Sequence, residues 1–305
     1  MLTESFKQTL HNVHGEKGRA WMDAFPGLLQ YCEKHWNLTI GKPFSLSYNY
    51  VAPAVLQSGH EAVLKLCVPG DEFLSELQAL QLFQGRGMVE LFDYNRERGV
   101  LLLERILPGN PLADLEDDSV AVVLAAKALD QLWAEVPLGT NLPSIKSREE
   151  SMKRIERENK DGLANISAEH IKQASALFTY MIETSEKEYL LHGDFHHFNL
   201  LKNSVGDWTV IDPKGLIGER EYDLIQYFLN KWPQTNLKNI IRNRAEIFTR
   251  ELKLNKKRLF LWGYCHSVLS SCWSAESGHD TDTIRAAEVF RELLLEEHIV
   301  LEVFK

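Results

Sequence analysis

Two aspartates and an asparagine lie at spacings that could support phosphoryl transfer. Asp194 is followed five positions later by Asn199, and Asp212 comes eighteen positions after Asp194. Phosphoryl transfer of the kinase type uses one carboxylate to accept the proton of the attacking hydroxyl, while an amide oxygen and a second carboxylate hold metal ions on the phosphates. The sequence therefore predicts Asp194 as the catalytic base, and Asn199 and Asp212 as Mg²⁺ ligands.

Apolar runs flank these residues and should form the short strands that position them. Tyr189–Leu191 precedes the polar loop, Leu200–Leu201 follows it, and Trp208–Ile211 leads into Asp212. An aspartate that follows a glycine, as Asp194 does, can also simply cap backbone amides in a turn. The three polar residues taken together, rather than any one of them, favour catalysis.

The longer string around these residues resembles a known family. His-Gly-Asp-Phe-His-His-Phe-Asn at 192–199, followed by Ile-Asp-Pro-Lys-Gly at 211–215, is similar to the aminoglycoside phosphotransferase-like small-molecule kinases. With its paired histidines it looks most like the streptomycin 6-kinase and hydroxyurea-resistance kinase branch. The resemblance is specific over residues 189–223 and looser elsewhere. It implies ATP and Mg²⁺ as cofactors, and it implies that His192 holds the catalytic loop through backbone hydrogen bonds.

The same resemblance implies an α+β, two-lobed protein-kinase-like fold. We expect an N-terminal lobe with a small antiparallel β-sheet and extra N-terminal helices, and a mainly α-helical C-terminal lobe. The predicted nucleotide-covering lobe spans residues 1–106, and the predicted catalytic and acceptor-binding lobe spans 107–305. The turn cluster at 108–111, Pro-Gly-Asn-Pro, is a plausible boundary between them.

Periodicity and turn residues predict the individual elements. Residues 5–37 should be helical with an interruption at Pro26, and a turn at 57–60 should join two strands of a hairpin. Further helices are expected, one of them with Ser167 as its N-cap. The predicted strands are 44–51, 62–67, 87–94 and 100–104, and the predicted later helices are 72–83, 119–135, 148–160, 168–187, 222–231, 237–252, 257–275 and 281–303.

Lys65 lies on one of these strands, where alternation places it on the same face as Val63. The kinase template has a lysine on its third strand, paired with a glutamate on the next helix, and this pair grips the phosphates. Glu76 is the best candidate partner, because Glu72 falls in the first turn, where a carboxylate favours the helix dipole. The alternative is that Lys65 and Glu76 are ordinary surface charges.

Other nucleotide contacts are predicted less directly. The first hairpin has no Gly-x-Gly-x-x-Gly, so the hydroxyls and amide of Ser47, Tyr48 and Asn49 are candidates for covering the phosphates. Backbone groups of residues 104–106, from Glu104 to Ile106, are expected to bind the adenine edge as the linker of kinases does.

The acceptor pocket should be built from second-lobe helices. Trp273 and Glu276, with Ser274 and Asp280 nearby, are candidates because carboxylates and an indole suit a guanidinium or ammonium group. The alternative places Trp273 in the core and the acids on a solvated helix end. Asp223 is a further candidate, although the resemblance favours a structural role for it in supporting the catalytic loop. Lys214 either neutralises phosphate charge or is simply exposed.

Composition sets broader limits. The 305 residues are enough for two lobes with separate cores, and the net charge of −9 argues against a nucleic-acid binder. That charge is compatible with a cationic substrate, but a solvated acidic surface is the favoured explanation. No stretch has signal-peptide or membrane-spanning character, and the four scattered cysteines form no disulfide framework. We therefore expect a reduced, cytoplasmic protein; the sequence does not predict its oligomeric state.

These patterns predict an ATP- and Mg²⁺-dependent phosphotransferase that acts on a hydroxyl of a small molecule. The resemblance implies an aminoglycoside such as streptomycin, or hydroxyurea, as acceptor, with antibiotic resistance as a possible role. A housekeeping metabolite kinase of the fructosamine, choline or homoserine type would carry the same motifs. Two other classes stay open. One is a non-catalytic nucleotide-binding scaffold, and the other is a metal-dependent hydrolase built on His192, His196 and His197.

Overall fold

The computed structural model describes residues 2–232 and 235–301, and the chain folds into two compact units. The first unit runs to Gly109 and also includes Lys202–Thr209. The second runs from Asn110 to Leu201 and continues from Val210. A short hairpin of the first unit therefore comes from a distant part of the sequence.

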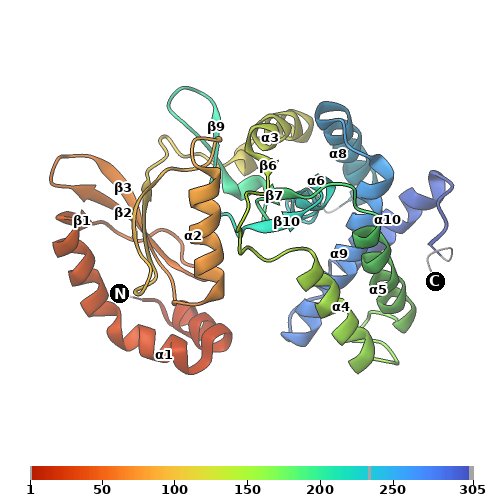
Figure 1. Ribbon diagram of the computed structural model, residues 1–305, viewed down its shortest axis with the longest axis horizontal. Helices are drawn as coiled ribbons and strands as arrows, with labels where there is room; N and C mark the ends of the chain where they lie inside the picture. Colours follow the sequence, from red (N-terminus) through yellow and green to blue (C-terminus); the bar gives the residue numbers. More distant parts are fainter. Residues whose placement is uncertain (1, 233–234, 302–305) are drawn as a thin grey trace. The chain divides into compact units, whose positions relative to one another are not determined.

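An antiparallel sheet forms the centre of the first unit, with strand order β1-β2-β3-β5-β4. Small and apolar side chains on one face of β3 join a core with helix α1, whereas α2 lies on the other side of the sheet (Figure 1). Lys65 alternates away from that core, which places it on the α2 side. The elements are α1 (Glu4–His35), β1 (Leu38–Ile40), β2 (Tyr50–Leu56), β3 (Glu61–Leu66), α2 (Asp71–Phe83), β4 (Leu91–Asn95) and β5 (Val100–Glu104).

Two predictions for this unit are wrong. The first helix continues through Pro26 and breaks instead at Gly15, whose φ of 55° is a backbone conformation that glycine adopts most readily. Trp21, Phe25 and Leu28 are buried on both sides of the proline, and this packing holds the helix together there. Residues 44–49 are irregular, and β2 begins only at Tyr50. Serine and asparagine at 45, 47 and 49 favour bends, because their side chains compete for backbone hydrogen bonds.

Helices dominate the second unit, and α9 lies at its centre. Its buried residues surround the helix on all sides, which is typical of a helix enclosed by others. Helices α5 and α10 pack against it, and Ser167 caps α5 as predicted. The helices are α3 (Asp118–Leu132), α4 (Lys146–Glu158), α5 (Ala168–Glu183), α6 (Arg220–Asp223), α7 (Ile225–Phe228), α8 (Leu237–Leu252), α9 (Lys256–Glu276) and α10 (Ile284–Glu296), with 3₁₀ turns η1 (Leu112–Asp114) and η2 (His197–Asn199).

The helix predicted over 222–231 is two short turns, α6 and α7, rather than one helix. Arg244 explains the early end of α7, because its guanidinium binds the carbonyls of Tyr227, Asn230 and Lys231 in place of later amides. The helix predicted over 281–303 extends from Ile284 to Glu296, and residues 302–303 lie outside the described part of the chain.

Short strands position the loop that carries the candidate catalytic residues. Strands β10, β7 and β6 form one antiparallel sheet, and β8 and β9 form a two-stranded one. Strand β7 ends immediately before His192, and β9 ends two residues before Asp212. The bounds are β6 (Ala134–Glu135), β7 (Tyr189–Leu191), β8 (Leu200–Lys202), β9 (Trp208–Val210) and β10 (Leu216–Gly218).

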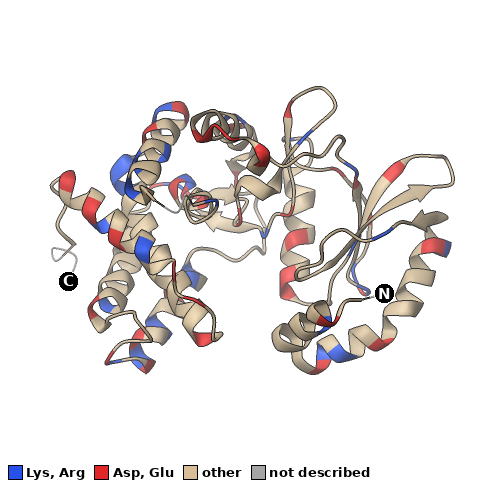
Figure 2. Cartoon of the chain, turned by 180° about the vertical axis from the view of Figure 1, so that it is seen from behind, with Lys and Arg blue, Asp and Glu red and all other residues tan. Residues whose placement is uncertain are grey.

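Charged residues of both signs lie along the outer helices (Figure 2). In the second unit Lys238 of α8 pairs with Glu292 and Glu296 of α10, and Arg242 also pairs with Glu296. Much of the acidic excess is thus interspersed with cations. None of the described helices is both long and apolar enough to cross a membrane. The four cysteines are buried free thiols.

Candidate active site

Gly193 sets the turn from β7 into the candidate catalytic loop. Its φ of +81° is in the left-handed region. A Cβ atom at this position would also lie 3.3 Å from the Cβ of Leu216 and 3.4 Å from that of Lys214. The conformation and the close approach of the Asp-Pro-Lys-Gly segment together favour glycine.

Asp223 anchors the start of this loop. Its carboxylate accepts hydrogen bonds from the backbone N–H groups of His192 (2.9 Å) and Gly193 (2.8 Å), and from the indole N–H of Trp133 (3.0 Å). The side chain is 2% exposed, and burial raises its pKa. With both oxygens engaged by buried donors, Asp223 has the geometry of a structural support and not that of an acceptor contact.

His192 is held on both sides of its ring. Its Nε2 lies 2.9 Å from the carbonyl of Ile211, and its Nδ1 accepts the backbone N–H of Asp194 at 3.1 Å. Because a carbonyl only accepts and an amide N–H only donates, these contacts specify the neutral Nε2–H tautomer. Neither nitrogen is therefore available for a metal. Among residues 2–232 and 235–301 no cluster of three or more His, Cys, Asp and Glu side chains could hold one, which counts against the hydrolase alternative.

Asp194 is partly exposed and lies beside two basic side chains. Lys214 Nζ is 3.5 Å from its Oδ2, and His196 Nε2 is 3.9 Å from its Oδ1. Burial lowers the pKa of His196, and the charge of Asp194 opposes that effect. A carboxylate that faces solvent on one side and a lysine on the other can both approach an acceptor hydroxyl and receive its proton.

Asn199 and Asp212 offer oxygen atoms of the kind that Mg²⁺ prefers. The amide nitrogen of Asn199 donates to the carbonyl of Asp194 at 3.0 Å, which assigns its other amide atom, Oδ1, as the oxygen available to a cation. The carbonyl of Asn199 accepts the N–H of Ile211 at 2.9 Å, so the residue before Asp212 is tied directly to this loop. Two protein oxygens, completed by phosphate oxygens and water, fit a magnesium site.

The backbone at Asp212 is unusual. Its φ of 59° is rare for residues other than glycine, and such conformations concentrate at functional sites. The next residues are tied back to the loop, because the N–H groups of Lys214 (2.9 Å) and Gly215 (3.0 Å) both donate to the carbonyl of His192. The segments around Asp194 and Asp212 thus form one hydrogen-bonded assembly.

The first unit holds a second candidate element. Lys65 Nζ lies 2.5 Å from Glu76 Oε1, and the two residues are 5% and 7% exposed. The structure thus brings the predicted lysine on β3 and the predicted glutamate on α2 together, rather than leaving them as surface charges. Removal of either partner of such a buried ion pair is strongly destabilising, because it leaves an uncompensated charge.

The other predicted nucleotide contacts are less clearly organised. Ser47 and Asn49 lie on a bend before β2, with Ser47 and Tyr48 exposed. The N–H of Glu104 already donates to the carbonyl of Glu90 at 2.9 Å. An adenine donor would therefore have to come from the residues after it, as far as the buried Ile106.

The candidate acceptor residues Trp273 and Glu276 meet helix α4. Glu276 accepts two hydrogen bonds from Arg154, at 2.7 and 2.8 Å, and the indole of Trp273 donates to Ser151 at 2.9 Å. Arg148 also lies over the Trp273 ring, 5.2 Å from its centroid. Arg154 thus balances the charge of Glu276, and a contact between Glu276 and the acceptor stays a prediction. Ser274 and Asp280 form no comparable cluster among the described contacts.

Sequence reasoning missed several of these partners. Trp133, Arg148 and Arg154 contact candidate site residues from 90 to 125 positions away in the chain, as the bond to Asp223 and those to Glu276 show. The dense charges of both signs at 148–160 are typical of a solvated helix face, and nothing in their spacing marks which arginine faces inward. Only the tertiary packing of α4 against α9 does so.

Comparison with solved structures identifies the fold. The structure matches a thermostable mutant of aminoglycoside phosphotransferase APH(4)-Ia, in ternary complex with ADP and hygromycin B, with a TM-score of 0.64. The match has 15% sequence identity and covers 87% of this chain and 97% of the other. The fold is thus the two-lobed, protein-kinase-like fold predicted from the sequence.

The sequence identifies the family. Residues 35–278 match the aminoglycoside/hydroxyurea antibiotic resistance kinases, and the chain belongs to this family of small-molecule phosphotransferases. Streptomycin 6-kinase of Streptomyces glaucescens is 29% identical over 284 residues, which cover 91% of this chain and 92% of the relative. Hydroxyurea phosphotransferase of Kitasatospora aureofaciens is 27% identical over 266 residues, covering 87% and 77%. The resemblance inferred from residues 189–223 is confirmed.

Proposed function

We propose that this protein transfers the γ-phosphoryl group of Mg·ATP to a hydroxyl of an aminoglycoside, with streptomycin as the first acceptor to test. The observation that carries the proposal is the set of hydrogen bonds that join the loop from Asp194 to Asn199 with the residues on either side of Asp212, which supports a base and two metal-binding oxygens within one site. The name of the relative from Streptomyces glaucescens supports the choice of acceptor. A role in antibiotic resistance and a cytoplasmic location follow from this proposal.

In the proposed reaction the acceptor oxygen forms a bond to the γ-phosphorus as the bond from that phosphorus to the β–γ bridging oxygen breaks. Asp194 orients the hydroxyl and takes its proton, and ADP leaves. Asn199 and Asp212 would hold Mg²⁺, which neutralises charge on the phosphates. Lys65, oriented by Glu76, contacts the phosphates. Catalysis of this kind depends mainly on positioning and charge stabilisation.

Each half of this machinery is assembled within its own unit. The Lys65–Glu76 pair is complete within the first unit, and the Asp194 loop is complete within the second. We accordingly propose nucleotide covering for the first unit, and catalysis with acceptor binding for the second. An intact set of both elements also argues against a non-catalytic scaffold.

One observation favours a second candidate acceptor. Glu276 is neutralised by Arg154, whereas Lys214 lies beside Asp194 and Arg148 covers Trp273. Cations near the acceptor side suit a neutral or acidic hydroxyl compound better than streptomycin, which carries guanidinium groups. Hydroxyurea, or a metabolite alcohol that bears a carboxylate such as homoserine, is therefore the alternative.

ADP release from Mg·ATP tests the proposal. The panel comprises streptomycin and other aminoglycosides, hydroxyurea, homoserine, choline and a fructosamine, each with and without EDTA. Stimulation by one acceptor that is lost with EDTA is expected. Asp194→Ala should reduce turnover by at least about 10²-fold while nucleotide binding survives. Retained turnover in Asp194→Ala would refute the assigned base, and stimulation by homoserine alone would select the second candidate.

A further inference from the structure

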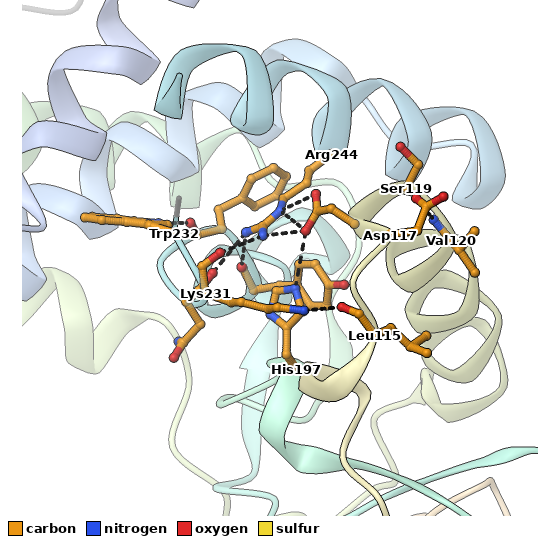
Figure 3. Close-up of polar contacts among 12 residues, drawn as sticks. Leu115, Asp117, Ser119, Val120, His197, Lys231, Trp232 and Arg244 are labelled. Atoms are coloured by element: carbon orange, nitrogen blue, oxygen red, sulfur yellow. Dashed lines mark hydrogen bonds and ion pairs between the residues drawn. The ribbon is translucent and has the colours of Figure 1, made fainter. Parts of the chain in front are cut away.

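A buried ion pair lies against the far end of the catalytic loop. Arg244 of α8 is 1% exposed, and its guanidinium binds both oxygens of Asp118, the first residue of α3, at 2.6 to 3.1 Å. Its remaining N–H groups bind the carbonyls of Tyr227 (3.1 Å), Asn230 (3.0 Å) and Lys231 (3.0 Å). Figure 3 shows Arg244 at the centre of these contacts. One side chain thereby joins α8, α3 and the segment after α7.

Lys231 adds a further connection between the same segments. Its ammonium group donates to the carbonyl of Leu115, just before α3 (Figure 3). The backbone of Lys231 is left-handed, with a φ of 52°. The segment after α7 has no regular secondary structure, but it is fixed both by its backbone carbonyls, which bind Arg244, and by the side chain of Lys231.

His197 of the catalytic loop rests on this assembly. Its ring is fully buried and stacks on Tyr227, with ring centroids 3.7 Å apart. Its Nε2 lies 3.9 Å from Asp118 Oδ1, which is longer than a hydrogen bond. Within the described chain neither ring nitrogen of His197 has a hydrogen-bond partner. The position of the His197 ring therefore depends on its stacking against Tyr227 and on the nearby carboxylate of Asp118.

Arg244 controls both of those contacts. It binds the Tyr227 carbonyl, its guanidinium lies 5.4 Å from the centroid of the Tyr227 ring, and it holds Asp118. Burial acts to raise the pKa of Asp118, but the hydrogen bonds and the charge of Arg244 outweigh it and keep that pKa well below its usual range. Asp118 is thus a fixed negative charge at neutral pH. Burial lowers the pKa of His197 to about 4, so the ring above it is neutral.

The loop is therefore held at two ends by different means. Asp223 binds the backbone at His192 and Gly193, as described above, whereas within residues 2–232 and 235–301 no carboxylate binds the amides next to Asn199 in this way. Asn199 is two residues from His197 and is itself bonded to the carbonyl of Asp194. A shift of His197 would move the proposed metal ligand and the segment that carries the base.

We propose that Arg244 and Asp118 are positioning residues for phosphoryl transfer, which act through Tyr227 and His197 to hold the Asp194–Asn199 loop in the conformation that presents Asn199 to the metal ion. This inference rests on the proposed function for the role of Asn199. The placement of the loop by the ion pair can be tested without turnover.

A second arginine of the same unit, with 18% of its side chain exposed, supplies a control. Arg258 of α9 binds Glu219 through two nitrogens, at 2.8 Å each, and also binds the carbonyl of Met181 at 2.7 Å. Glu219 is buried, as Arg244 is. In the described part of the chain no hydrogen bond of Arg258 reaches residues 192–199. Its loss should lower stability in the same way without releasing the loop.

The experiment compares Asp118→Asn and Arg244→Lys with Arg258→Lys, each well below its own melting temperature. Asp118→Asn keeps a side-chain oxygen that can accept a hydrogen bond from Arg244 but removes the negative charge. It is the milder of the two changes and serves as the test if Arg244→Lys folds poorly. Amide hydrogen exchange over 194–199 is measured first. It should rise by about tenfold in the first two variants and stay near the wild-type rate in Arg258→Lys.

Binding of AMP-PNP with and without Mn²⁺ provides the second measurement. In Asp118→Asn and Arg244→Lys the affinity for AMP-PNP with Mn²⁺ should fall by about tenfold, because groups that orient metal ligands have effects of this size. The affinity for AMP-PNP without Mn²⁺ should change little. Unchanged loop exchange in Asp118→Asn, or an equal rise in Arg258→Lys, would overturn the inference. Wild-type protein that binds no nucleotide would instead overturn the proposed function, and the exchange result would still decide the role of the ion pair.

Discussion

The catalytic loop and the candidate acceptor region are held by different kinds of interaction. The loop is fixed through its backbone: buried Asp223 binds two successive amides, and the carbonyl of His192 receives two more. The acceptor region is fixed only between side chains, as in the pair of Arg154 and Glu276, which are 38% and 30% exposed. The backbone hydrogen bonds of the loop should persist when residues elsewhere are substituted, whereas the partly exposed pair of Arg154 and Glu276 can be replaced at little cost in stability. This difference is suited to a site whose reaction stays the same while its acceptor changes.

The largest effect is expected from Asp223→Ala, which removes the anchor of the loop. Three buried N–H groups, those of His192, Gly193 and Trp133, would lose their acceptor, at a cost of about 1–3 kcal/mol each where water does not replace it. Displacement of the loop should also lower kcat by about 10²-fold. Urea unfolding and ADP release measure the two effects. An unfolding free energy within about 1 kcal/mol of wild type would show that the anchoring is weak.

The Lys65–Glu76 pair provides the next test, because it separates stability from function. Lys65→Met leaves a buried carboxylate without its cation and should destabilise the protein by about 3–5 kcal/mol. The double variant Lys65→Met with Glu76→Gln removes both charges and should recover most of that stability.

Turnover with ATP should stay low in both variants, since neither retains the phosphate-binding cation. Recovery of activity together with stability in the double variant would show that the pair is structural only. Urea unfolding and the dependence of rate on ATP concentration distinguish these outcomes.

A smaller effect is expected from Arg154→Ala in the acceptor region. An exposed pair of this kind contributes about 0.2–1 kcal/mol, so thermal stability should change little. Freeing Glu276 should change KM for a cationic acceptor such as streptomycin, with kcat nearly unchanged. Lys238→Ala breaks a comparable surface pair with Glu292 and Glu296 and serves as the control. A fall in kcat as large as that of Asp223→Ala would remove the distinction between the two regions.

The smallest effect at neutral pH is expected from two of the buried thiols, Cys32 in the first unit and Cys272 in the second. Burial raises the pKa of Cys32 and of Cys272 from 9.0 to about 12. Above pH 9 the unfolded chain releases thiol protons that the folded chain keeps, so the folded state loses stability as pH rises from 9 towards 12. The slope is at most about 1.4 kcal/mol per pH unit for each thiol.

Urea unfolding at pH 7, 9 and 10 measures this loss. Cys32→Ala should have a shallower dependence on pH than wild type, even though the cavity it leaves lowers its stability at pH 7. Identical slopes in the two proteins would show that Cys32 ionises as readily in the folded state as in the unfolded one.

The sequence predicted the bounds of helices and strands better than the contacts between distant side chains. Strand β5 and helix α8 have the predicted bounds, and α2, α5 and α9 differ from prediction by a few residues at their ends, because their apolar periodicity and caps are local properties. The break at Gly15 was missed, since Pro26 is the stronger local signal and only core packing overrides it. Proximity within the candidate site was predicted best where its members are close in sequence, as with Asp194 and Asn199, which a hydrogen bond joins.

The sequence alone identified the family and its class of chemistry: the residue types and spacings from His192 to Gly215 predict a base, two oxygen ligands and the glycines that permit their turns. Only the tertiary structure decided what holds those groups and what surrounds them. Trp133, Arg154 and Arg244 act from distant helices, and the sequence did not predict that Arg154 pairs with Glu276. The physical reason is that hydrogen bonds and ion pairs depend on distances in space, and local sequence pattern does not encode which helix faces will meet.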